Sequence, residues 1–324
     1  MIRKQLVIIG LLFAAIAVKG QAKKQITVSA DGSGDYKTVQ AAFDAIPQGN
    51  KKPVLVFVKN GVYKEKLHLD STKAFVTLVG ESKFNTVLTY DDHTGKIGTD
   101  GKMISTPTSY SFKVMADNFT AHDITFENSA GFTAGQAVAV ESDGDRAVFT
   151  NCRFIGNQDI LFTNNESSRQ YYKDCYIEGT TDFIFGAATC WFEQCHIHSK
   201  KNSHVTAAST PQSHNVGYVF NDCRLTGDSA LHMVSLGRPW RPYAWVIYMH
   251  CYIGQQVKAE GWSNWNKTES YKTARYFEFQ NYGPGAAVAG RVEWSRQMST
   301  AEAGKLTIKN VLGGKDHWNP ELKN

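Results

Sequence analysis

The sequence predicts an all-β protein folded as a parallel β-helix, a solenoid whose coils stack on one another. A short motif recurs along the chain at intervals of 20 to 28 residues, and its copies alternate apolar and polar residues. Long stretches of helical periodicity are nearly absent, and the best helix candidate is residues 36–46, with Thr38 as its N-cap. Because such short repeats cannot bury their apolar face alone, neighbouring copies must stack to form a core.

The repeated motif is marked by cysteine. Each copy follows an apolar or aromatic stretch and places a polar residue directly before the cysteine; the copies centre on Cys152, Cys175, Cys195, Cys223 and Cys251. A turn signal follows soon after, often a glycine such as Gly156 or Gly179, and residues 123–126 look like an earlier copy without the cysteine. We expect these cysteines to form an inward ladder of buried free thiols, with disulfides as the alternative. Cys190 falls outside the motif, and its redox state is left open.

The N-terminal segment predicts secretion. Residues 1–22 combine a basic start, an apolar stretch at 6–18 and small residues near the end, which is typical of a cleaved signal peptide. A buried N-terminal helix is the alternative. The mature chain, residues 23–324, contains no Pro/Gly/Ser linker, so we expect a single domain, either periplasmic or extracellular. None of its segments is long and apolar enough for a membrane span.

The charge of the chain limits its partners. The formal net charge is +5, and loss of the signal peptide would remove the three positive charges of Arg3, Lys4 and Lys19. The remainder does not provide the clustered basic residues of a nucleic-acid-binding protein. It is compatible with an acidic polysaccharide but does not require one.

The repeat brings two acids together. Asp159 and Asp182 each lie seven residues after the cysteine of their own copy. Equal offsets in neighbouring coils place both carboxylates on one face, a single strand spacing of about 4.8 Å apart. Gln136 lies 23 residues before Asp159, and Gln158 precedes it directly. The register therefore predicts a cluster of two acids and two amides on one side of the solenoid.

Such a cluster can support ester chemistry. Two close carboxylates disfavour each other's charge, so one keeps its proton as an acid while the other acts as nucleophile or base. Amide groups can stabilise an oxyanion on an attacked carbonyl. The alternative is a polar stack that only satisfies the backbone groups of the turns.

Longer segments around these residues match a known pattern in order and spacing. They are Gly-Val-Tyr-Lys-Glu at 61–65, Gln-Ala-Val-Ala-Val at 136–140, Gln-Asp-Ile-Leu at 158–161, Asp-Phe-Ile-Phe-Gly at 182–186 and Leu-Gly-Arg-Pro-Trp at 236–240. Gly-Trp at 261–262 and Asn-Tyr-Gly-Pro-Gly-Ala at 281–286 add to the pattern. With them the chain resembles the pectinesterase family, a group of carbohydrate esterases, over nearly the whole mature sequence.

The resemblance implies a right-handed parallel β-helix and ester hydrolysis without a metal or other cofactor. It implies that Asp182 is the nucleophile and that Asp159 is the general acid and later the base. It further implies that Gln136 and Gln158 stabilise the oxyanion and that Arg238 holds Asp182 ionised and oriented.

The resemblance also implies a sugar-binding cleft lined by Phe185, Trp240 and Trp262. The expected substrate is methyl-esterified homogalacturonan (pectin), from which the enzyme would release methanol, and we expect a monomer. Two positions depart from the family's pattern. Ile160 replaces the usual threonine, and Asn157 stands where an aromatic residue is often found, which puts a substrate contact there in doubt.

Other functions remain open at this stage. Paired carboxylates also suit a retaining glycosidase acting on pectin. A β-helix pectin lyase is a further alternative, but it would need a calcium site and a basic residue to abstract a proton. The aromatic residues suit a non-catalytic carbohydrate-binding solenoid. The segment 227–231 resembles a serine-esterase nucleophile block, with Asp316 and His317 as partners, but the repeat already explains its glycine as a turn. The acidic run at 91–93 resembles a metal site, yet we expect a solvated loop because no second cluster matches it.

Overall fold

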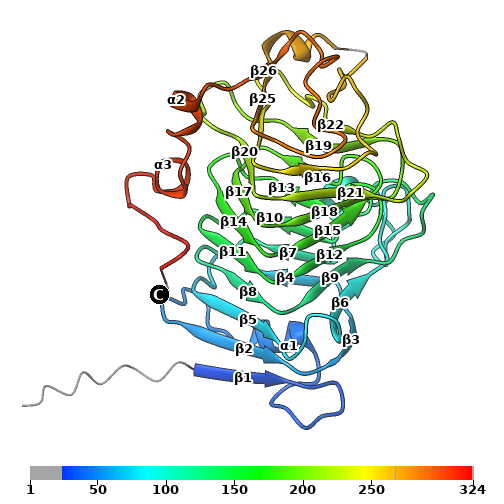
Figure 1. Ribbon diagram of the computed structural model, residues 1–324. Helices are drawn as coiled ribbons and strands as arrows, with labels where there is room; N and C mark the ends of the chain where they lie inside the picture. The colour runs from blue at the N-terminus through cyan, green and yellow to red at the C-terminus, as the bar shows by residue number, and fades with distance from the viewer. Residues whose placement is uncertain (1–23, 267, 323–324) are drawn as a thin grey trace, which may run out of the picture.

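The computed structural model describes residues 24–266 and 268–322. The predicted signal peptide lies outside these residues. The described chain winds through three parallel sheets, and successive strands in each sheet come from successive coils (Figure 1).

The largest sheet has 11 strands within the described residues. In spatial order they are β1 (Lys24–Val28), β2 (Val54–Val58), β5 (Val76–Gly80), β8 (Thr120–His122), β11 (Ala147–Thr150), β14 (Arg169–Lys173), β17 (Thr189–Glu193), β20 (Tyr218–Asn221), β23 (Trp245–Met249), β25 (Arg275–Phe279) and β26 (Ser295–Gln297).

Two smaller sheets complete each coil. The 7-stranded sheet contains β4 (Leu67–Leu69), β7 (Phe112–Val114), β10 (Val140–Ser142), β13 (Leu161–Thr163), β16 (Ile184–Gly186), β19 (His204–Ala208) and β22 (Ser235–Gly237). The 8-stranded sheet contains β3 (Gly61–Lys64), β6 (Thr86–Tyr90), β9 (Thr125–Asn128), β12 (Arg153–Ile155), β15 (Tyr176–Gly179), β18 (His196–Ser199), β21 (Arg224–Gly227) and β24 (Tyr252–Ile253).

The polar residue before each motif cysteine makes the corner between two sheets. Asn151, for example, has a φ of 52° and Asp174 a φ of 53°, both in the left-handed region. Asn and Asp tolerate that conformation better than most residues. A single such residue bends the chain from the 11-stranded sheet into the 8-stranded sheet, so the motif repeats once per coil.

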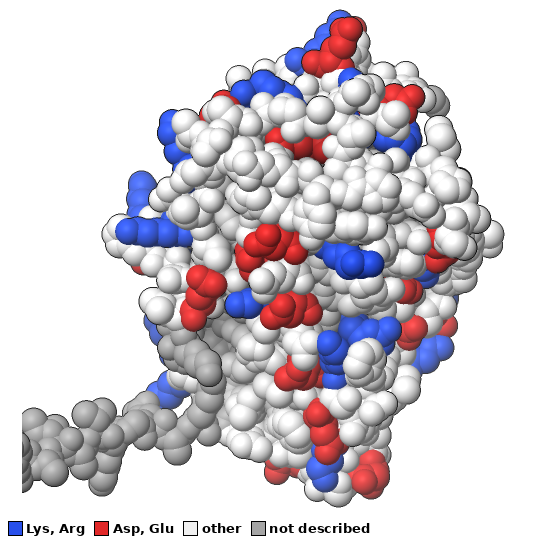
Figure 2. Space-filling view, viewed as in Figure 1, with Lys and Arg blue, Asp and Glu red and all other residues white. Residues whose placement is uncertain are grey.

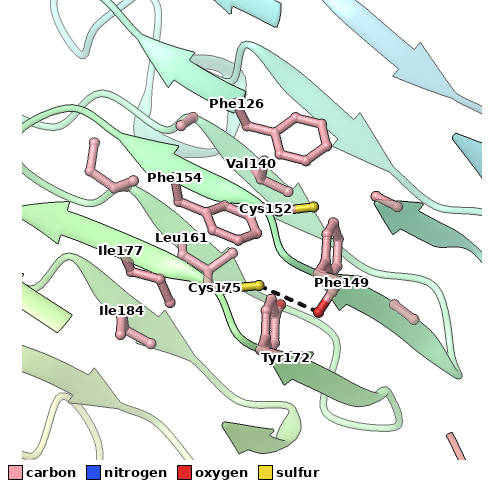
Figure 3. Close-up of a cluster of buried hydrophobic side chains, with 14 of the residues drawn as sticks. Phe126, Val140, Phe149, Cys152, Phe154, Leu161, Tyr172, Cys175, Ile177 and Ile184 are labelled. Carbon is pink, nitrogen blue, oxygen red and sulfur yellow. Dashed lines mark hydrogen bonds between the residues drawn. The ribbon is translucent and has the colours of Figure 1, made fainter. Parts of the chain in front are cut away.

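The core lies inside the solenoid and is built as ladders. The cysteines are all free and buried, which confirms the predicted thiol ladder, and Cys190 is also buried and free. Figure 3 shows Cys152 and Cys175 beside inward side chains from all three sheets, with the Cys175 thiol donating to the Phe149 carbonyl at 3.4 Å. Aromatic rings stack above one another in the same way, as in Phe149 on Tyr172 with centroids 5.1 Å apart.

Short helices cover two parts of the solenoid. They are α1 (Val39–Asp44), η1 (Thr106–Thr108), η2 (Ser270–Thr273), α2 (Thr300–Ala303) and α3 (Ile308–Leu312). Phe43 of α1 stacks on Phe112 at the N-terminal end of the core. Residues of α2 and α3 pack on the outer face of the 11-stranded sheet, beside Trp191 and Ile247 (Figure 1).

Thr38 is the N-cap of α1, as predicted, and its hydroxyl accepts from the Ala41 N–H at 3.2 Å. The helix is shorter than the predicted 36–46. Tyr36 instead pairs with Val28 as a β-bridge, and Pro47 disfavours helical geometry in the residue before it.

The outer surface carries charges of both signs. On the face shown in Figure 2, Lys and Arg side chains are interspersed with Asp and Glu side chains. No helix among the described residues has the length and apolarity needed to cross a membrane.

Candidate active site

The two aspartates predicted to meet occupy equivalent positions in consecutive coils. Each lies two residues before a strand of the 7-stranded sheet, and Leu161 of β13 pairs with Ile184 of β16. Asp159 has a φ of 63° and Asp182 a φ of 50°, so both turn the chain in the left-handed conformation. The neighbouring strands set the two carboxyl groups about one strand spacing apart, about 4.8 Å. Each residue is only 5% exposed.

Burial and neighbouring charges give the two carboxyl groups different pKa values. Burial raises the pKa of Asp159 well above its usual range, and the charge of Asp182 raises that pKa further. Burial also raises the pKa of Asp182, but the hydrogen bonds and charge of Arg238 oppose that rise. Asp182 is therefore the group that ionises first, and Asp159 keeps its proton. Arg238 lies against Asp182 and opposes the rise of its pKa, although burial keeps the pKa of Asp182 above its usual value.

Arg238 holds Asp182 through two hydrogen bonds. Its Nε donates to Oδ1 at 3.0 Å and its Nη2 donates to Oδ2 at 2.6 Å. This paired geometry fixes the orientation of the carboxylate as well as its charge. The guanidinium also stacks on the indole of Trp265, with its carbon 3.8 Å from the ring centroid. The plane of the arginine is thus fixed from two sides.

The two glutamines flank Asp159. Gln136 and Gln158 form an isolated parallel bridge, and the Ala137 N–H donates to the Gln158 carbonyl at 3.1 Å. The side-chain amides of both lie close to the Asp159 carboxyl, and their interaction with it opposes the rise of its pKa. Both are half-buried, so their amides lie at the rim of the acid pair. The predicted cluster of two acids and two amides is thus assembled, with Arg238 beside it.

An aromatic platform continues from the aspartates along the outer face of the 7-stranded sheet. Phe185 stacks on Phe162 with centroids 4.3 Å apart and planes at 5°. The Trp240 ring contacts both, with its centroid 5.9 Å from that of Phe185 and 6.5 Å from that of Phe162. Phe162 was missed by the sequence analysis, although it lies three residues after Asp159, the same offset as Phe185 from Asp182. That equal offset is the signal that identifies it.

The prediction that Trp262 lines the cleft is wrong. Its side chain has no exposed surface, and it packs between Tyr248 and Tyr276 inside the solenoid. The Leu236 N–H donates to the Gly261 carbonyl and the Ser263 N–H donates to the Gly237 carbonyl. Residues 261–263 therefore run beside β22 as a further rung, and strand alternation turns Trp262 inward. Trp265, three residues later, is the tryptophan that reaches the site.

The competing motifs do not assemble. Ser229 follows β21 on the 8-stranded sheet, whereas Asp316 is paired with Arg169 of β14 on the 11-stranded sheet, at 2.6 Å. Among the described residues, no group of three or more His, Cys, Asp or Glu side chains is placed to hold a metal ion.

The prediction of a solvated loop at 91–93 needs a correction, because Asp92 is only 5% exposed. It pairs with Lys66 at 2.5 Å and Lys96 at 3.0 Å, so lysines neutralise this acidic run. Of the two departures from the family's pattern, Ile160 packs in the core, and Asn157 donates to the Ala130 carbonyl at 3.0 Å.

The sequence profile of the pectinesterase family matches residues 25–315. The chain belongs to the pectinesterase family. Among curated family members, Pectinesterase 31 of Arabidopsis thaliana is 41% identical over 286 residues, which cover 87% of this chain and 90% of the relative. Putative pectinesterase 11 of the same plant is 36% identical over 300 residues, which cover 91% and 81% of the two chains. Pectinesterases are carboxylic ester hydrolases, so the predicted enzyme class is confirmed.

Solved structures of family members share this fold. Pectin methylesterase from carrot matches with a TM-score of 0.83 at 33% identity, over 92% of this chain and 95% of the carrot chain. The enzyme from Erwinia chrysanthemi matches with a TM-score of 0.80 at 27% identity, over 94% and 100% of the two chains. A pectin methylesterase in complex with a hexasaccharide matches equally well, with a TM-score of 0.80 at 27% identity over 92% and 98%. These likenesses confirm the prediction of a right-handed parallel β-helix.

Proposed function

We propose that this member of the pectinesterase family hydrolyses the methyl esters of homogalacturonan, and that Asp182 and Asp159 carry the reaction. The observation that supports this most directly is the unequal acid pair: two adjacent buried carboxyls, of which only Asp182 is held by a guanidinium. An ionised Asp182 and a protonated Asp159 are the two forms that attack on an ester and departure of an alcohol require.

In the first half-reaction the Asp182 carboxylate attacks the ester carbonyl carbon and forms a tetrahedral intermediate. The side-chain amides of Gln136 and Gln158 donate to its oxyanion. Asp159 then gives its proton to the methoxy oxygen, the carbon–oxygen bond breaks, and neutral methanol leaves. The product is an anhydride between the galacturonyl carboxyl and Asp182.

In the second half-reaction Asp159, now ionised, takes a proton from water as the water attacks the anhydride carbonyl. Collapse of this second intermediate releases a galacturonate carboxylic group and returns the Asp182 carboxylate. Both aspartates finish in their starting forms. Arg238 stays bonded to Asp182 and favours its departure as a carboxylate.

The aromatic platform supports a role in sugar binding. Trp240 is half-buried and offers a flat apolar face, whereas Phe185 is only 4% exposed and is mostly covered by its neighbours. We therefore assign the larger contact to Trp240 and a supporting role to Phe185 and Phe162. Trp265 acts on the site through Arg238.

Three products distinguish the esterase from other pectin-degrading enzymes. Highly methylated pectin is incubated with the protein, and methanol, reducing ends and the absorbance of unsaturated products are measured. Methanol without new reducing ends supports the proposed function. New reducing ends would indicate a glycosidase, absorbance would indicate a lyase, and binding without any product would indicate a carbohydrate-binding solenoid.

The site of action follows from the substrate. We infer that the protein is secreted, to the periplasm or outside the cell, after cleavage near residue 22, and that it acts as a monomer. N-terminal sequencing of the mature protein tests the cleavage, and light scattering tests the oligomeric state. A mature protein that begins at Met1 contradicts the first inference, and a stable dimer contradicts the second.

A further inference from the structure

A column of outward-facing side chains runs along the 8-stranded sheet, whereas the acid pair lies beside the 7-stranded sheet. Each member faces outward from its strand and pairs in register with the next, because the alternate residues of these strands fill the core. The arginine–tyrosine column, as we name it, consists of Arg153, Tyr176, His196, Arg224, Tyr252 and Tyr282.

Neighbouring members of the column contact one another. The Arg153 guanidinium lies 5.7 Å from the ring centroid of Tyr176, and the Arg224 guanidinium lies 4.8 Å from that of Tyr252. The Tyr252 ring meets Tyr282 edge-on at 5.7 Å. Two arginines, three tyrosines and one histidine therefore line five strand spacings, or roughly 24 Å.

The arginines of the column lack carboxylate partners. In the part of the chain that the structure describes, neither Arg153 nor Arg224 has a carboxylate oxygen within 4.0 Å. Arg238, by contrast, forms an ion pair with Asp182, with Nη2 2.6 Å from Oδ2. The nearby Glu178 carboxylate pairs with the Lys200 ammonium at 3.2 Å and accepts a hydrogen bond from the Tyr176 hydroxyl at 2.9 Å. Two guanidinium groups thus remain available to an anion from outside.

Exposed aromatic rings mark both ends of the column. Phe84 is 62% exposed and lies over Arg153, with the guanidinium 5.1 Å from its centroid. Tyr282 is 60% exposed at the other end. A polymer lying along the column can reach a ring at each end and the two guanidinium groups between them.

We propose that the arginine–tyrosine column is a binding surface for de-esterified homogalacturonan, separate from the catalytic site. Each galacturonate unit of that polymer presents a sugar ring and a carboxylate. The exposed rings of Phe84 and Tyr282 offer apolar surface to the sugars, and arginine forms strong paired hydrogen bonds with carboxylates. Removal of methyl esters creates the carboxylates that the column recognises, so the choice of polymer rests on the proposed function. The surface would hold the enzyme on stretches of pectin that already carry free carboxylates.

The test measures binding of polygalacturonate, which carries no methyl ester, by titration calorimetry on the mature protein. All proteins carry Trp240→Ala, which weakens the contribution of the catalytic cleft. The double variant Arg153→Gln/Arg224→Gln is expected to bind at least about tenfold more weakly, because two charge-assisted contacts are lost. Tyr282→Ala is expected to weaken binding by a smaller factor, and its exposure makes a folding defect an inadequate explanation.

The matched control is Lys51→Gln/Lys52→Gln, which removes the same charge from exposed residues before β2 and is expected to bind normally. The proposal is overturned if the arginine double variant binds polygalacturonate as tightly as its parent, or if the lysine control loses as much affinity. It is also overturned if the arginine variant loses equal affinity for dextran sulfate, since the column would then attract any polyanion.

Catalysis provides a separate readout. With Trp240 intact, the arginine double variant is expected to release methanol from short methylated oligogalacturonates at the parent rate, because these ligands do not need the column. Absence of methanol release by the parent protein would refute the proposed function, while the calorimetry would still decide on the column. A double variant that loses methanol release on short substrates would contradict the separation of the two sites.

Discussion

Two ladders of polar side chains run through the same coils, and only one of them carries the acid pair that we propose to react. The turn ladder consists of Asn151 and Asp174, and the acid ladder consists of Asp159 and Asp182. In each coil the acid follows the turn residue by eight positions, and all four residues adopt the left-handed conformation. The turn ladder is open: Asn151 is half-buried and donates to Asp123 at 2.5 Å, and Asp174 is exposed. The acid ladder is 95% buried and has a guanidinium beside it. Register places side chains together in both ladders, but only the acid ladder adds the burial and the fixed counter-charge that the proposed reaction requires.

The comparison predicts its largest effect at Asp182. Asp182→Asn removes the proposed nucleophile and is expected to lower kcat by at least about ten-thousandfold. Asp174→Asn makes the same chemical change at the corresponding corner of the turn ladder and is expected to leave kcat unchanged. Methanol release from methylated pectin measures both. Normal turnover by Asp182→Asn, in protein free of deamidation, would remove Asp182 from the reaction.

Trp262 extends the contrast between core and surface. Trp262→Ala is expected to lower the free energy of unfolding by about 3–5 kcal/mol, because it opens a cavity between Tyr248 and Tyr276. It also leaves Glu278 without its indole partner. Urea denaturation measures the loss, and KM of the folded fraction is expected to stay unchanged. A raised KM with normal stability would place Trp262 in the cleft after all.

Glu141 is a third buried acid on the same sheet, paired with a lysine instead of an arginine. Its Oε1 accepts from the Lys113 ammonium at 2.8 Å, and burial raises the pKa of Glu141 to about 7 from 4.5. Since folding favours the protonated form, this stabilisation is complete below pH 4.5 and is lost as pH rises to about 7. The loss amounts to about 3 kcal/mol.

Glu141→Gln, which stays neutral, is expected to remove this part of the pH dependence. Unfolding free energies of native protein and variant are compared across that pH range, so that the contributions of all other groups cancel. The native protein should lose stability relative to the variant as pH rises. Parallel curves would show that Glu141 titrates normally.

A substitution of Arg238 tests which aspartate of the acid ladder ionises. Arg238→Ala removes the group that opposes the raised pKa of Asp182, so that pKa rises further and the acidic limb of kcat/KM moves to higher pH. The coupled pair as a whole sets this limb. At neutral pH kcat/KM is expected to fall about a hundredfold and to recover partly as pH rises.

Arg238→Lys keeps the charge and is the matched control, with a smaller shift of the limb expected. Trp265→Ala, which removes only the ring stacked on the guanidinium, is expected to shift the acidic limb by less than Arg238→Lys does. An acidic limb that does not move in Arg238→Ala would mean that another group selects which aspartate ionises.

The smallest effect is expected at Trp240, on the platform beside the acids. Trp240→Ala removes the flat surface that we propose to bind sugar, but no reacting group, so KM for pectin is expected to rise about tenfold with kcat largely kept. Initial rates over a range of pectin concentrations separate the two constants. An unchanged KM would exclude Trp240 from substrate binding.

The sequence by itself determined the coil and its register. Cysteines at intervals of 20 to 28 residues fix which residues stack, and equal offsets from them place Asp159 next to Asp182. The same equal offset places Phe162 beside Phe185. These relations follow from a local repeat because parallel strands preserve register from one coil to the next.

Only the tertiary structure decided what lies outside the repeat. Residues 261–263 carry no copy of the motif, and hydrogen bonds to β22 determine that Trp262 faces the core. Trp265 then reaches Arg238 from an irregular segment that no periodicity describes. The protonation order of the aspartates likewise depends on burial, because the cost of removing a charge from water is set by every element packed around it.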